Sequence, residues 1–475
     1  MEYEAVIGLE VHVQLKTKTK AFCSCSTEFG NPANTQTCPI CLGLPGSLPV
    51  LNKTALEYAL KVCLSLNCKI QEYTKFDRKN YFYPDLPKNY QISQYDLPLA
   101  LGGFLEIELE TGDRKKIGIH RIHLEEDAGK LIHTQDKSLV DFNRCGIPLL
   151  EIVSEPEIAN PQEAYQYLIS LKELLKYLDV SDCDMEKGSL RCDANISLRK
   201  KGSLSLGTKI ELKNMNSFKA VRDALSYEIY RQKLVLQKRK RLSQETRLWD
   251  PKKEKTFPMR RKEEAQDYRY FPDPDLPVFV IDKEKLKMLK ASLPELPFEK
   301  KMRFLKEYGI TGSELDFIVS ERQIADYFEA CVKIYPKPKT IFNWIAGPLV
   351  SELNELKISF RELKLNPSDF IELIRMFEDK KLSNIVAKEV LKEMLRTEKK
   401  ANQIVEEKGL LQISDKDILS KLAWEVISEN PVAVSDYRSG KINALMFLVG
   451  QAMKKMKGKA DPKLLQVILK EILDK

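Results

Sequence analysis

The sequence predicts an α+β protein, with a sheet-rich N-terminal domain followed by helices. Strand-like alternation of apolar and polar residues dominates the first half, and from Phe298 onward an apolar spacing of three and four residues replaces it. The chain has 475 residues, more than a single core normally supports. We therefore expect an antiparallel sheet with flanking helices in residues 1–292, a helical domain in residues 293–407 and a small helical tail domain in residues 408–475.

Composition places the chain among globular proteins. It is 43% hydrophobic and 31% charged, and it has no apolar run near the roughly 18 residues that cross a bilayer. The N-terminus, MEYEAVIGLEVHV, is acidic and strand-like, which is unlike a signal peptide. We expect a soluble protein of the cytoplasm with no membrane partner.

Positive charge is concentrated at the C-terminus. Residues 438–475 contain nine basic and three acidic residues, so they carry +6 of the net charge of +8. Such a tail suits a polyanion partner, but a lysine-rich solvated helix face would have the same composition. Composition alone leaves both interpretations open.

The first predicted strand covers residues 5–15, AVIGLEVHVQL. Leu9, Val11 and Val13 alternate with Glu10 and His12, so one face of the strand is apolar and the other carries side chains that can bind metals or protons. Glu10 and His12 could ligate one cation, or they could lie on an ordinary solvated face.

Four of the ten cysteines cluster in the loop at residues 22–45. Cys23 and Cys25 form one pair, and Cys38 and Cys41 form another after twelve intervening residues. Two close pairs of thiolates suit a tetrahedral Zn²⁺, which would replace a core that this polar loop cannot build. We predict a structural zinc site, because a shell of four sulfurs leaves no open position for catalysis. Four small buried residues are the alternative.

A helix is predicted from Thr54 to Leu66, and an irregular wall of aromatics, prolines and charges from Phe76 to Leu99. Lys79, Lys88 and the tyrosines of this wall could contact phosphates and bases, or its aromatic side chains could simply fill a small satellite core under the loop. The run Arg78-Lys79-Asn80 beside Tyr81 favours the functional interpretation.

The segment from Phe104 to Leu178 is predicted to form two strands, a turn, a third strand and a helix. Phe104–Glu110 alternates cleanly, and IGIHRIHLEE places His123 and Glu125 on one face. Cys145-Gly146-Ile147-Pro148 is predicted to turn into a buried strand at residues 149–153, so Cys145 is expected to be structural. Residues 161–178 have helical spacing.

Residues 185–199 and 206–218 are predicted to form a hairpin. Its polar face would carry Asp193 on one strand and Glu211 and Lys213 on the other. This mixture of side chains is typical of a Mg²⁺-nucleotide site. The helical half begins near residue 293, with helix starts expected at Asn366 and near Ser383.

If these strands join one antiparallel sheet, one of its faces becomes an acidic cation site suited to metal-assisted phosphoryl transfer or hydrolysis. The sequence lacks a P-loop, a G-x-S-x-G elbow and an H-E-x-x-H pair. The residues alone therefore indicate a Mg²⁺-using enzyme or a nucleic-acid binder.

Several long motifs resemble one family. LVDFNRCGIPLLEIVSEP, IGLEVHVQL, MEKGSLRCDANISLR, GTKIELKNMNSF, DYRYFPDPDLP and DYRSGKINALMFLVGQAMKKMKGKADP all look like the B subunits of the aspartyl/glutamyl-tRNA(Asn/Gln) amidotransferases, the GatB family, and together they span nearly the whole chain. The resemblance implies a cradle-shaped catalytic domain followed by helical and tail domains that grip tRNA. It also implies a heterotrimer with an amidase (glutaminase) A subunit plus a small C subunit.

The activity implied by the resemblance is ATP-dependent amidation of a misacylated tRNA. The B subunit would phosphorylate the side-chain carboxylate of Glu-tRNA(Gln) or Asp-tRNA(Asn), and ammonia released by the glutaminase would then displace phosphate. Carried over by position, the metal and phosphate site would fall on Glu10, His12, Glu125 and Glu211, with Glu211 also contacting the nucleotide. Lys79 would hold phosphate, with Lys213 a weaker candidate and Asp193 nearby. Cys23, Cys25, Cys38 and Cys41 match the zinc-bearing members.

Two other classes of function remain at this stage. One is a non-catalytic, zinc-containing scaffold subunit that binds tRNA, and the other is a Mg²⁺ nuclease using the same carboxylates. The acidic face distinguishes an enzyme from a scaffold subunit, because a scaffold has no need of Glu10, His12 and Glu125 together. The sequence does not indicate whether the glutamyl substrate, the aspartyl substrate or both are physiological.

Overall fold

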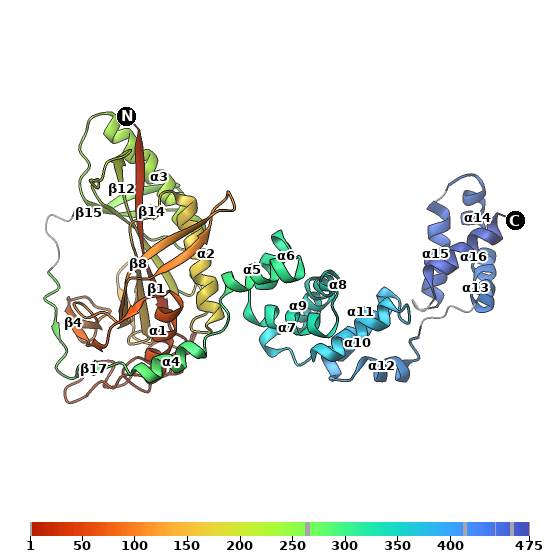
Figure 1. Ribbon diagram of the computed structural model, residues 1–475, viewed down its shortest axis with the longest axis horizontal. Coiled ribbons are helices and arrows are strands. Elements are labelled where there is room, and N and C mark those ends of the chain that lie inside the picture. The colour runs from red at the N-terminus through yellow and green to blue at the C-terminus, as the bar shows by residue number, and fades with distance from the viewer. Residues whose placement is uncertain (1, 262–266, 412–415, 442, 457–459, 475) are drawn as a thin grey trace. The chain divides into compact units, whose positions relative to one another are not determined.

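The computed structural model describes residues 2–261, 267–411, 416–441, 443–456 and 460–474. The chain divides into two compact units, Met1–Lys300 and Lys301–Lys475, and the α+β prediction is confirmed (Figure 1). Residues 442 and 457–459 of the tail motif lie outside the described residues, as do residues 262–266, which directly precede the motif DYRYFPDPDLP.

Within the described residues, the first unit is built on a ten-stranded sheet. The strand order is β15-β14-β13-β12-β1-β11-β8-β6-β2, with β7 also paired to β8. Neighbouring strands are antiparallel except for the parallel pair β13 and β14. The bounds are β1 Tyr3–Gln14, β2 Lys69–Ile70, β6 Ala100–Leu101, β7 Phe104–Glu108, β8 Arg114–Glu126, β11 Pro148–Ser154, β12 Leu190–Lys200, β13 Ile210–Lys213, β14 Glu245–Asp250 and β15 Lys255–Arg261.

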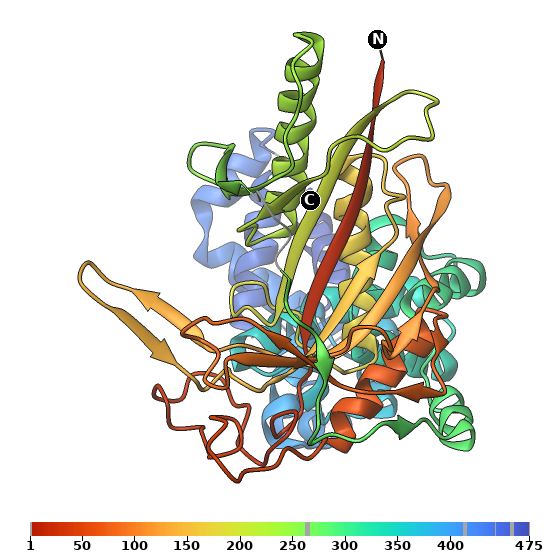
Figure 2. The same cartoon turned by 90° about the vertical axis from the view of Figure 1, so that its left-hand side faces the viewer.

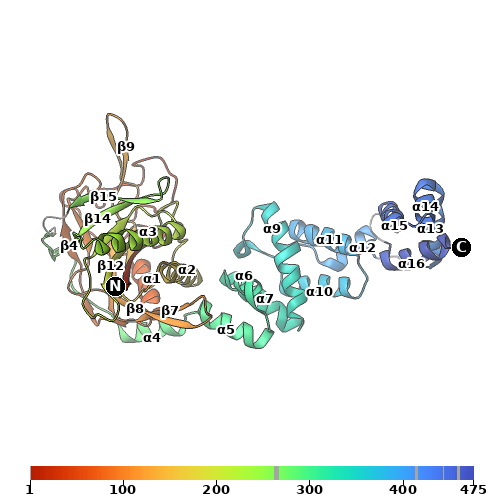
Figure 3. The same cartoon turned by 90° about the horizontal axis from the view of Figure 1, so that it is seen from above.

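Among the residues that the structure describes, short strands form three smaller sheets in the same unit. They are β16-β4-β5, β17-β3 and the hairpin β9-β10, which projects from the body of the unit (Figures 2 and 3). The prediction of an irregular wall at residues 76–99 is wrong in part, because β4 and β5 are paired strands. These strands were not recognised because four residues are too few to show the alternation of apolar and polar side chains. The bounds are β3 Tyr73–Thr74, β4 Asp77–Asn80, β5 Tyr90–Ser93, β9 Lys130–His133, β10 Ser138–Asp141, β16 Phe271–Pro272 and β17 Phe279–Val280.

Helices cover the apolar face of the large sheet. Leu9, Val11 and Val13 of β1 share one core with residues of α1 Lys53–Ser65, α2 Pro161–Tyr177 and α3 Phe218–Gln237. Figure 3 shows α2 and α3 side by side. The first two helices match their predictions. α3 was not predicted from the sequence, because its charged residues obscure its apolar stripe. α4, Lys283–Ala291, follows β17.

The second unit is helical, as predicted. Asn366 and Ser383 are helix N-caps, where the sequence placed helix starts. The last helices have a core of their own, formed by residues of α13, α15 and α16. The helices are α5 Pro297–Tyr308, which spans the boundary, α6 Gly312–Val319, α7 Arg322–Ile334, α8 Pro338–Trp344, the π-helix η1 Ile345–Leu349, α9 Val350–Leu356, the 3₁₀-helix η2 Phe360–Glu362, α10 Pro367–Glu378, α11 Asn384–Thr397, α12 Ala401–Lys408, α13 Lys416–Glu429, α14 Pro431–Arg438, α15 Asn443–Lys455 and α16 Pro462–Leu473.

The two compact units do not test the three predicted domain ranges, so the boundaries at residues 292/293 and 407/408 stay predictions. Among the described residues, no helix combines the length and the apolar composition that a membrane crossing requires.

Candidate functional site

The polar face of the large sheet gathers the candidate residues. In an antiparallel sheet, directly paired residues lie on the same face. His12 of β1 pairs with Glu151 of β11, and Glu151 pairs in turn with His123 of β8. Glu10 pairs with Asp193 of β12. The predicted strand alternation therefore produces one continuous polar face on the side opposite the helices.

Three carboxylates converge on the imidazole of His12. Its Nε2 atom lies 3.5 Å from Glu10 Oε1, 3.6 Å from Glu151 Oε2 and 3.9 Å from Glu125 Oε1. Glu125 is buried, and its other carboxylate oxygen accepts a 2.8 Å hydrogen bond from Ser93 Oγ of β5. The structure thus brings together three predicted residues and adds Glu151.

The electrostatics of this cluster favour a cation at its centre. Burial opposes the charged form of His12, but the hydrogen bond to Glu151 and the nearby carboxylates raise its pKa to about 9. Burial and then the charge of Glu151 raise the pKa of Glu125. Although burial opposes it, the contact with His12 lowers the pKa of Glu151. The carboxylates repel one another, so positive charge among them is stabilising.

Glu151 is the main residue that the sequence analysis missed. The sequence predicts a buried strand at residues 149–153 and assigns no site residue to it. A glutamate within such a strand was the available signal, since an ionised side chain is rarely buried without a partner. Glu151 is 7% exposed, and it contacts His12 and His123, with Oε1 3.9 Å from His123 Nδ1.

The donor set fits a divalent cation. Glu10, His12 and Glu151 can each offer one ligand atom, and these atoms lie within 4.8 Å of one another. Carboxylate oxygens with one imidazole suit Mg²⁺ or Mn²⁺, which complete their shells with water or phosphate oxygens. Glu125, predicted as a ligand, lies beside this group. Glu211, also predicted as a ligand, lies farther along the face.

Lys79 approaches the cluster from β4. It is half-buried, and its Nζ atom lies 5.0 Å from the centre of the Tyr268 ring. Burial would lower the pKa of Lys79, but the carboxylates of Glu125 and Glu151 and the neighbouring tyrosines raise it above its usual value. Lys79 therefore supplies a fixed positive charge next to the carboxylates.

Asp193, Glu211 and Lys213 form a second group on β12 and β13. Lys213 Nζ lies 2.5 Å from Asp193 Oδ2 and 3.3 Å from Glu211 Oε1. The other oxygen of Glu211 accepts a 2.7 Å hydrogen bond from Thr246 Oγ1 of β14. The predicted hairpin is confirmed, and Asn195 pairs with Glu211 across it. This group adjoins the His12 cluster, because Asp193 lies opposite Glu10.

The four predicted zinc ligands also converge. One sulfur from each of Cys23, Cys25, Cys38 and Cys41 lies within 4.8 Å of the others. Tetrahedral Zn²⁺ with Zn–S bonds of about 2.3 Å needs sulfurs about 3.8 Å apart, so the cluster fits this ion. Cys41 Sγ also accepts from the Cys38 backbone N–H at 3.2 Å and from Lys20 Nζ at 3.7 Å, contacts that suit a thiolate.

The loop carrying these cysteines is attached to the segment before β11. Buried Lys20 donates hydrogen bonds to the carbonyl oxygens of Gln36 and Phe142. The backbone N–H of Gln36 donates to Asn143 Oδ1 at 2.8 Å, and Asn34 Oδ1 accepts from the backbone N–H of Phe142 at 2.8 Å. The four-cysteine loop therefore supports the turn from which the Glu151 strand begins.

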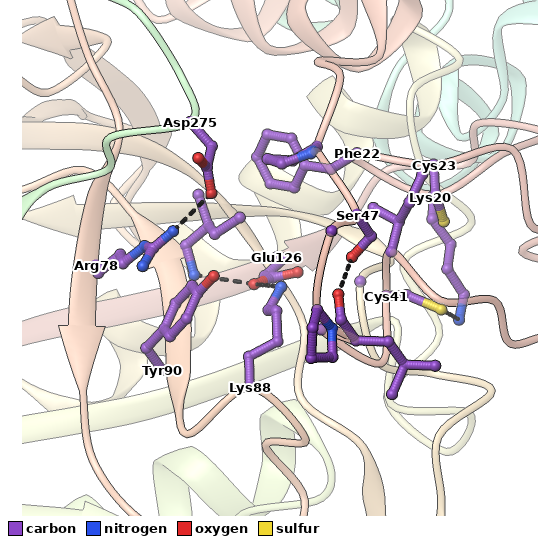
Figure 4. Close-up of a pocket in the computed structure, with 18 residues that line it drawn as sticks. Lys20, Phe22, Cys23, Cys41, Ser47, Arg78, Lys88, Tyr90, Glu126 and Asp275 are labelled. Atoms are coloured by element: carbon purple, nitrogen blue, oxygen red, sulfur yellow. Dashed lines mark hydrogen bonds and ion pairs between the residues drawn. The ribbon is translucent and has the colours of Figure 1, made fainter.

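A cavity of about 300 Å³ lies between this loop and β4–β5 (Figure 4). Its charged groups pair with one another: Lys88 with Glu126, and Arg78 with Asp275 at 2.8 Å. The ammonium group of Lys88, a candidate phosphate contact, is therefore paired with the carboxylate of Glu126. Cys145 is buried, and burial raises the pKa of its thiol to about 12, so it remains protonated and unreactive, as expected for a structural residue.

Comparison with known proteins identifies the family. The model described as the GatB/GatE catalytic domain matches residues 5–287, and the one described as the GatB domain matches residues 326–473. The chain belongs to the GatB family. The catalytic-domain match contains the complete polar face and the four-cysteine loop of this GatB chain.

Curated relatives agree with this assignment over the full length. The chain is 54% identical to the B subunit of the aspartyl/glutamyl-tRNA(Asn/Gln) amidotransferase from Caldanaerobacter subterraneus subsp. tengcongensis, covering 100% of both proteins. It is 53% identical to that of Carboxydothermus hydrogenoformans, covering 100% of this chain and 99% of the relative. The Brevibacillus brevis protein of the same name is 51% identical, with the same coverage. The resemblance predicted from the GatB motifs is confirmed.

Proposed function

We propose that this chain is the catalytic B subunit of a tRNA-dependent amidotransferase, a ligase of protein biosynthesis. It would use ATP and Mg²⁺ to phosphorylate the side-chain carboxylate of Glu-tRNA(Gln), Asp-tRNA(Asn) or both. Ammonia would then displace the phosphate, giving Gln-tRNA(Gln) or Asn-tRNA(Asn). The GatB family membership supports the reaction, and the carboxylates converging on His12 support this face as its site.

Phosphorylation is needed because a carboxylate is a poor electrophile. A carboxylate oxygen attacks the γ-phosphorus of ATP and ADP leaves; ammonia then attacks the acyl carbon and inorganic phosphate leaves. Mg²⁺ held by Glu10, His12 and Glu151, with Glu125 beside them, would neutralise charge on the transferring phosphoryl group. Glu211, which is also a predicted metal ligand, would support nucleotide binding from the neighbouring group.

The remaining predicted residues would bind and orient the reactants. Lys79 places a positive charge beside Glu125, where it would hold the phosphoryl group and the developing acyl phosphate. Lys213, oriented by Asp193, would contact the nucleotide phosphates from the other side. Glu125, whose pKa is raised by burial, is suited to accept a proton from the attacking ammonia.

The four-cysteine cluster would hold a structural Zn²⁺, and the chain would act in a heterotrimer in the cytoplasm. Its partners would be a glutaminase A subunit, which supplies ammonia, together with a small C subunit. The tail at residues 408–475 would bind the tRNA, for which the charge of +6 on residues 438–475 is suited.

Substitution of Glu125 tests the catalytic proposal. In the complex with its amidase partner, Glu125→Gln should abolish the ATP-dependent amidation of Glu-tRNA(Gln), whereas Glu110→Gln on an exposed turn should not change it. Unchanged turnover in Glu125→Gln would favour the alternative, a non-catalytic zinc-containing scaffold that binds tRNA. Loss of intact tRNA after incubation with Mg²⁺ and this chain alone would instead indicate a nuclease.

A further inference from the structure

Two nitrogen atoms on strand β8 are buried without a hydrogen-bond partner among the described residues. They are Nε of Arg121 and Nε2 of His123. The His123 side chain as a whole is only 5% exposed. A buried donor or acceptor without a partner is costly, and most such atoms in folded proteins are paired. Two of them at neighbouring positions on one strand therefore indicate a place where a ligand supplies the missing partners.

Both side chains lie on the polar face of the sheet. His123 pairs with Glu151, and Arg121 pairs with Val153, the residue that also lies opposite Glu10 on β1. Residues two apart on a strand share a face and are separated by about 6.6 Å. His123 thus lies in the same row of the sheet as His12 and Glu151, and Arg121 lies in the next row, with Glu10.

Arg121 differs from Arg191 and Arg247, two other arginines on this sheet. Arg191 lies 2.9 Å from Asp127, and Arg247 lies 2.6 Å from Glu245 and 3.1 Å from Glu228. For Arg121, no ion pair or hydrogen bond of the guanidinium is found among the described residues. The nearest carboxylate on its row, Glu10, already contacts His12. Arg121 therefore carries a positive charge that the surrounding chain does not neutralise.

We propose that Arg121 and His123 form an oxyanion-binding subsite of the active site, an inference that rests on the proposed function. The fork of guanidinium donors matches the geometry of a carboxylate or a phosphate, and a neutral imidazole adds one more N–H donor. Two groups of the proposed substrates have this chemistry: the side-chain carboxylate of the aminoacyl residue and the phosphates of ATP. Either would lie within reach of the cation site.

The test is steady-state kinetics of Arg121→Gln in the complex with the amidase partner, varying Glu-tRNA(Gln) and ATP separately. We expect the KM for one of them to rise roughly 10- to 100-fold, the effect of removing a hydrogen-bonded charge. A rise for Glu-tRNA(Gln) identifies the carboxylate, and a rise for ATP identifies the phosphates. Unchanged KM values for both overturn the proposal. Lys116→Gln, an exposed residue of the same strand, is the matched control.

Two further variants protect the test from a folding defect. Arg121→Lys keeps the positive charge but loses the paired N–H donors of the guanidinium. His123→Phe keeps an aromatic ring of similar shape but has no ring nitrogens. Each variant should raise the same KM, by less than Arg121→Gln does. Unchanged KM values in both variants would contradict the subsite even if Arg121→Gln failed to fold. Filter binding of Glu-tRNA(Gln) and equilibrium binding of ATP give the affinities without turnover. If the proposed function itself were wrong, the wild-type complex would make no Gln-tRNA(Gln), which is a different result from a changed KM in a variant.

Discussion

His12 and Glu151 are direct partners across β1 and β11, and His12 Nε2 lies 3.6 Å from Glu151 Oε2. The backbone register of two adjacent strands fixes this contact, so its geometry does not depend on a flexible loop. Glu10 joins them from the same strand as His12, two residues away. The three residues of the proposed cation site therefore all lie on paired strands of the large sheet.

Replacing Glu151 should weaken cation binding. Glu151→Gln removes one charged ligand and leaves the strand pairing intact, so we expect the affinity for Mn²⁺, measured by electron paramagnetic resonance, to fall at least about tenfold. Glu155→Gln, which changes a more exposed carboxylate just beyond the end of β11, should bind Mn²⁺ as the wild type does. Equal affinities for Glu151→Gln and the wild type would exclude Glu151 as a ligand.

Removing the metal from the four-cysteine loop should loosen the turn before β11. Cys38→Ser should lose the metal, measured as zinc per chain by mass spectrometry. Amide exchange should then increase in residues 31–36 and 140–146, which hydrogen bonds join. Cys331→Ser in the helical unit should retain zinc. A fully loaded Cys38→Ser protein, or unchanged exchange after metal loss, would contradict this coupling.

Thr246 should act through Glu211. Thr246→Val removes the hydroxyl that donates to Glu211 Oε2 at 2.7 Å, so the carboxylate loses its orientation. We expect the KM for ATP to rise about tenfold, the effect of one hydrogen bond to a charged group. Thr246→Ser keeps the hydroxyl and should restore the wild-type KM. If the valine and serine variants behave alike, Thr246 does not position Glu211.

The buried Glu228 should hold α3 to the sheet. Its carboxylate contacts Arg231 at 2.8 Å, Arg247 at 3.1 Å and Thr256 at 2.6 Å. Glu228→Gln removes the buried charge that Arg231 and Arg247 share and leaves them only Glu245 as a carboxylate partner, so it should lower the free energy of unfolding by about 3 kcal/mol in urea titrations. Removing the exposed Glu2–Lys201 pair with Glu2→Gln should change it by less than about 1 kcal/mol.

The sequence predicted those parts of the fold and site that depend on local periodicity. Alternation placed Glu10 and His12 on one face and His123 and Glu125 on another strand, and the structure brings these strands together. Pairing between strands that lie far apart in the chain has no local signal. The convergence of these residues on His12 could therefore be predicted only if the strands were assumed to join one sheet.

The omissions have specific physical reasons. Glu151 was passed over because its apolar neighbours made its strand appear purely structural. α3 was not predicted because its charged residues obscure the apolar stripe, and it is held by the buried Glu228, whose partners come from β14 and β15 as well as from α3 itself. β4 and β5 are too short to display a period. Each omission concerns a residue or element defined by tertiary contacts.

The most direct test of the proposed reaction is to trap the acyl phosphate. The complex is incubated with ATP, Mg²⁺, Glu-tRNA(Gln) and hydroxylamine, without glutamine, and the RNA-bound product is analysed by mass spectrometry. We predict a glutamyl γ-hydroxamate formed in equal amount to ADP, and neither product above background with Glu125→Gln. Formation of ADP without hydroxamate, or hydroxamate without ATP, would contradict phosphorylation of the side-chain carboxylate on this face.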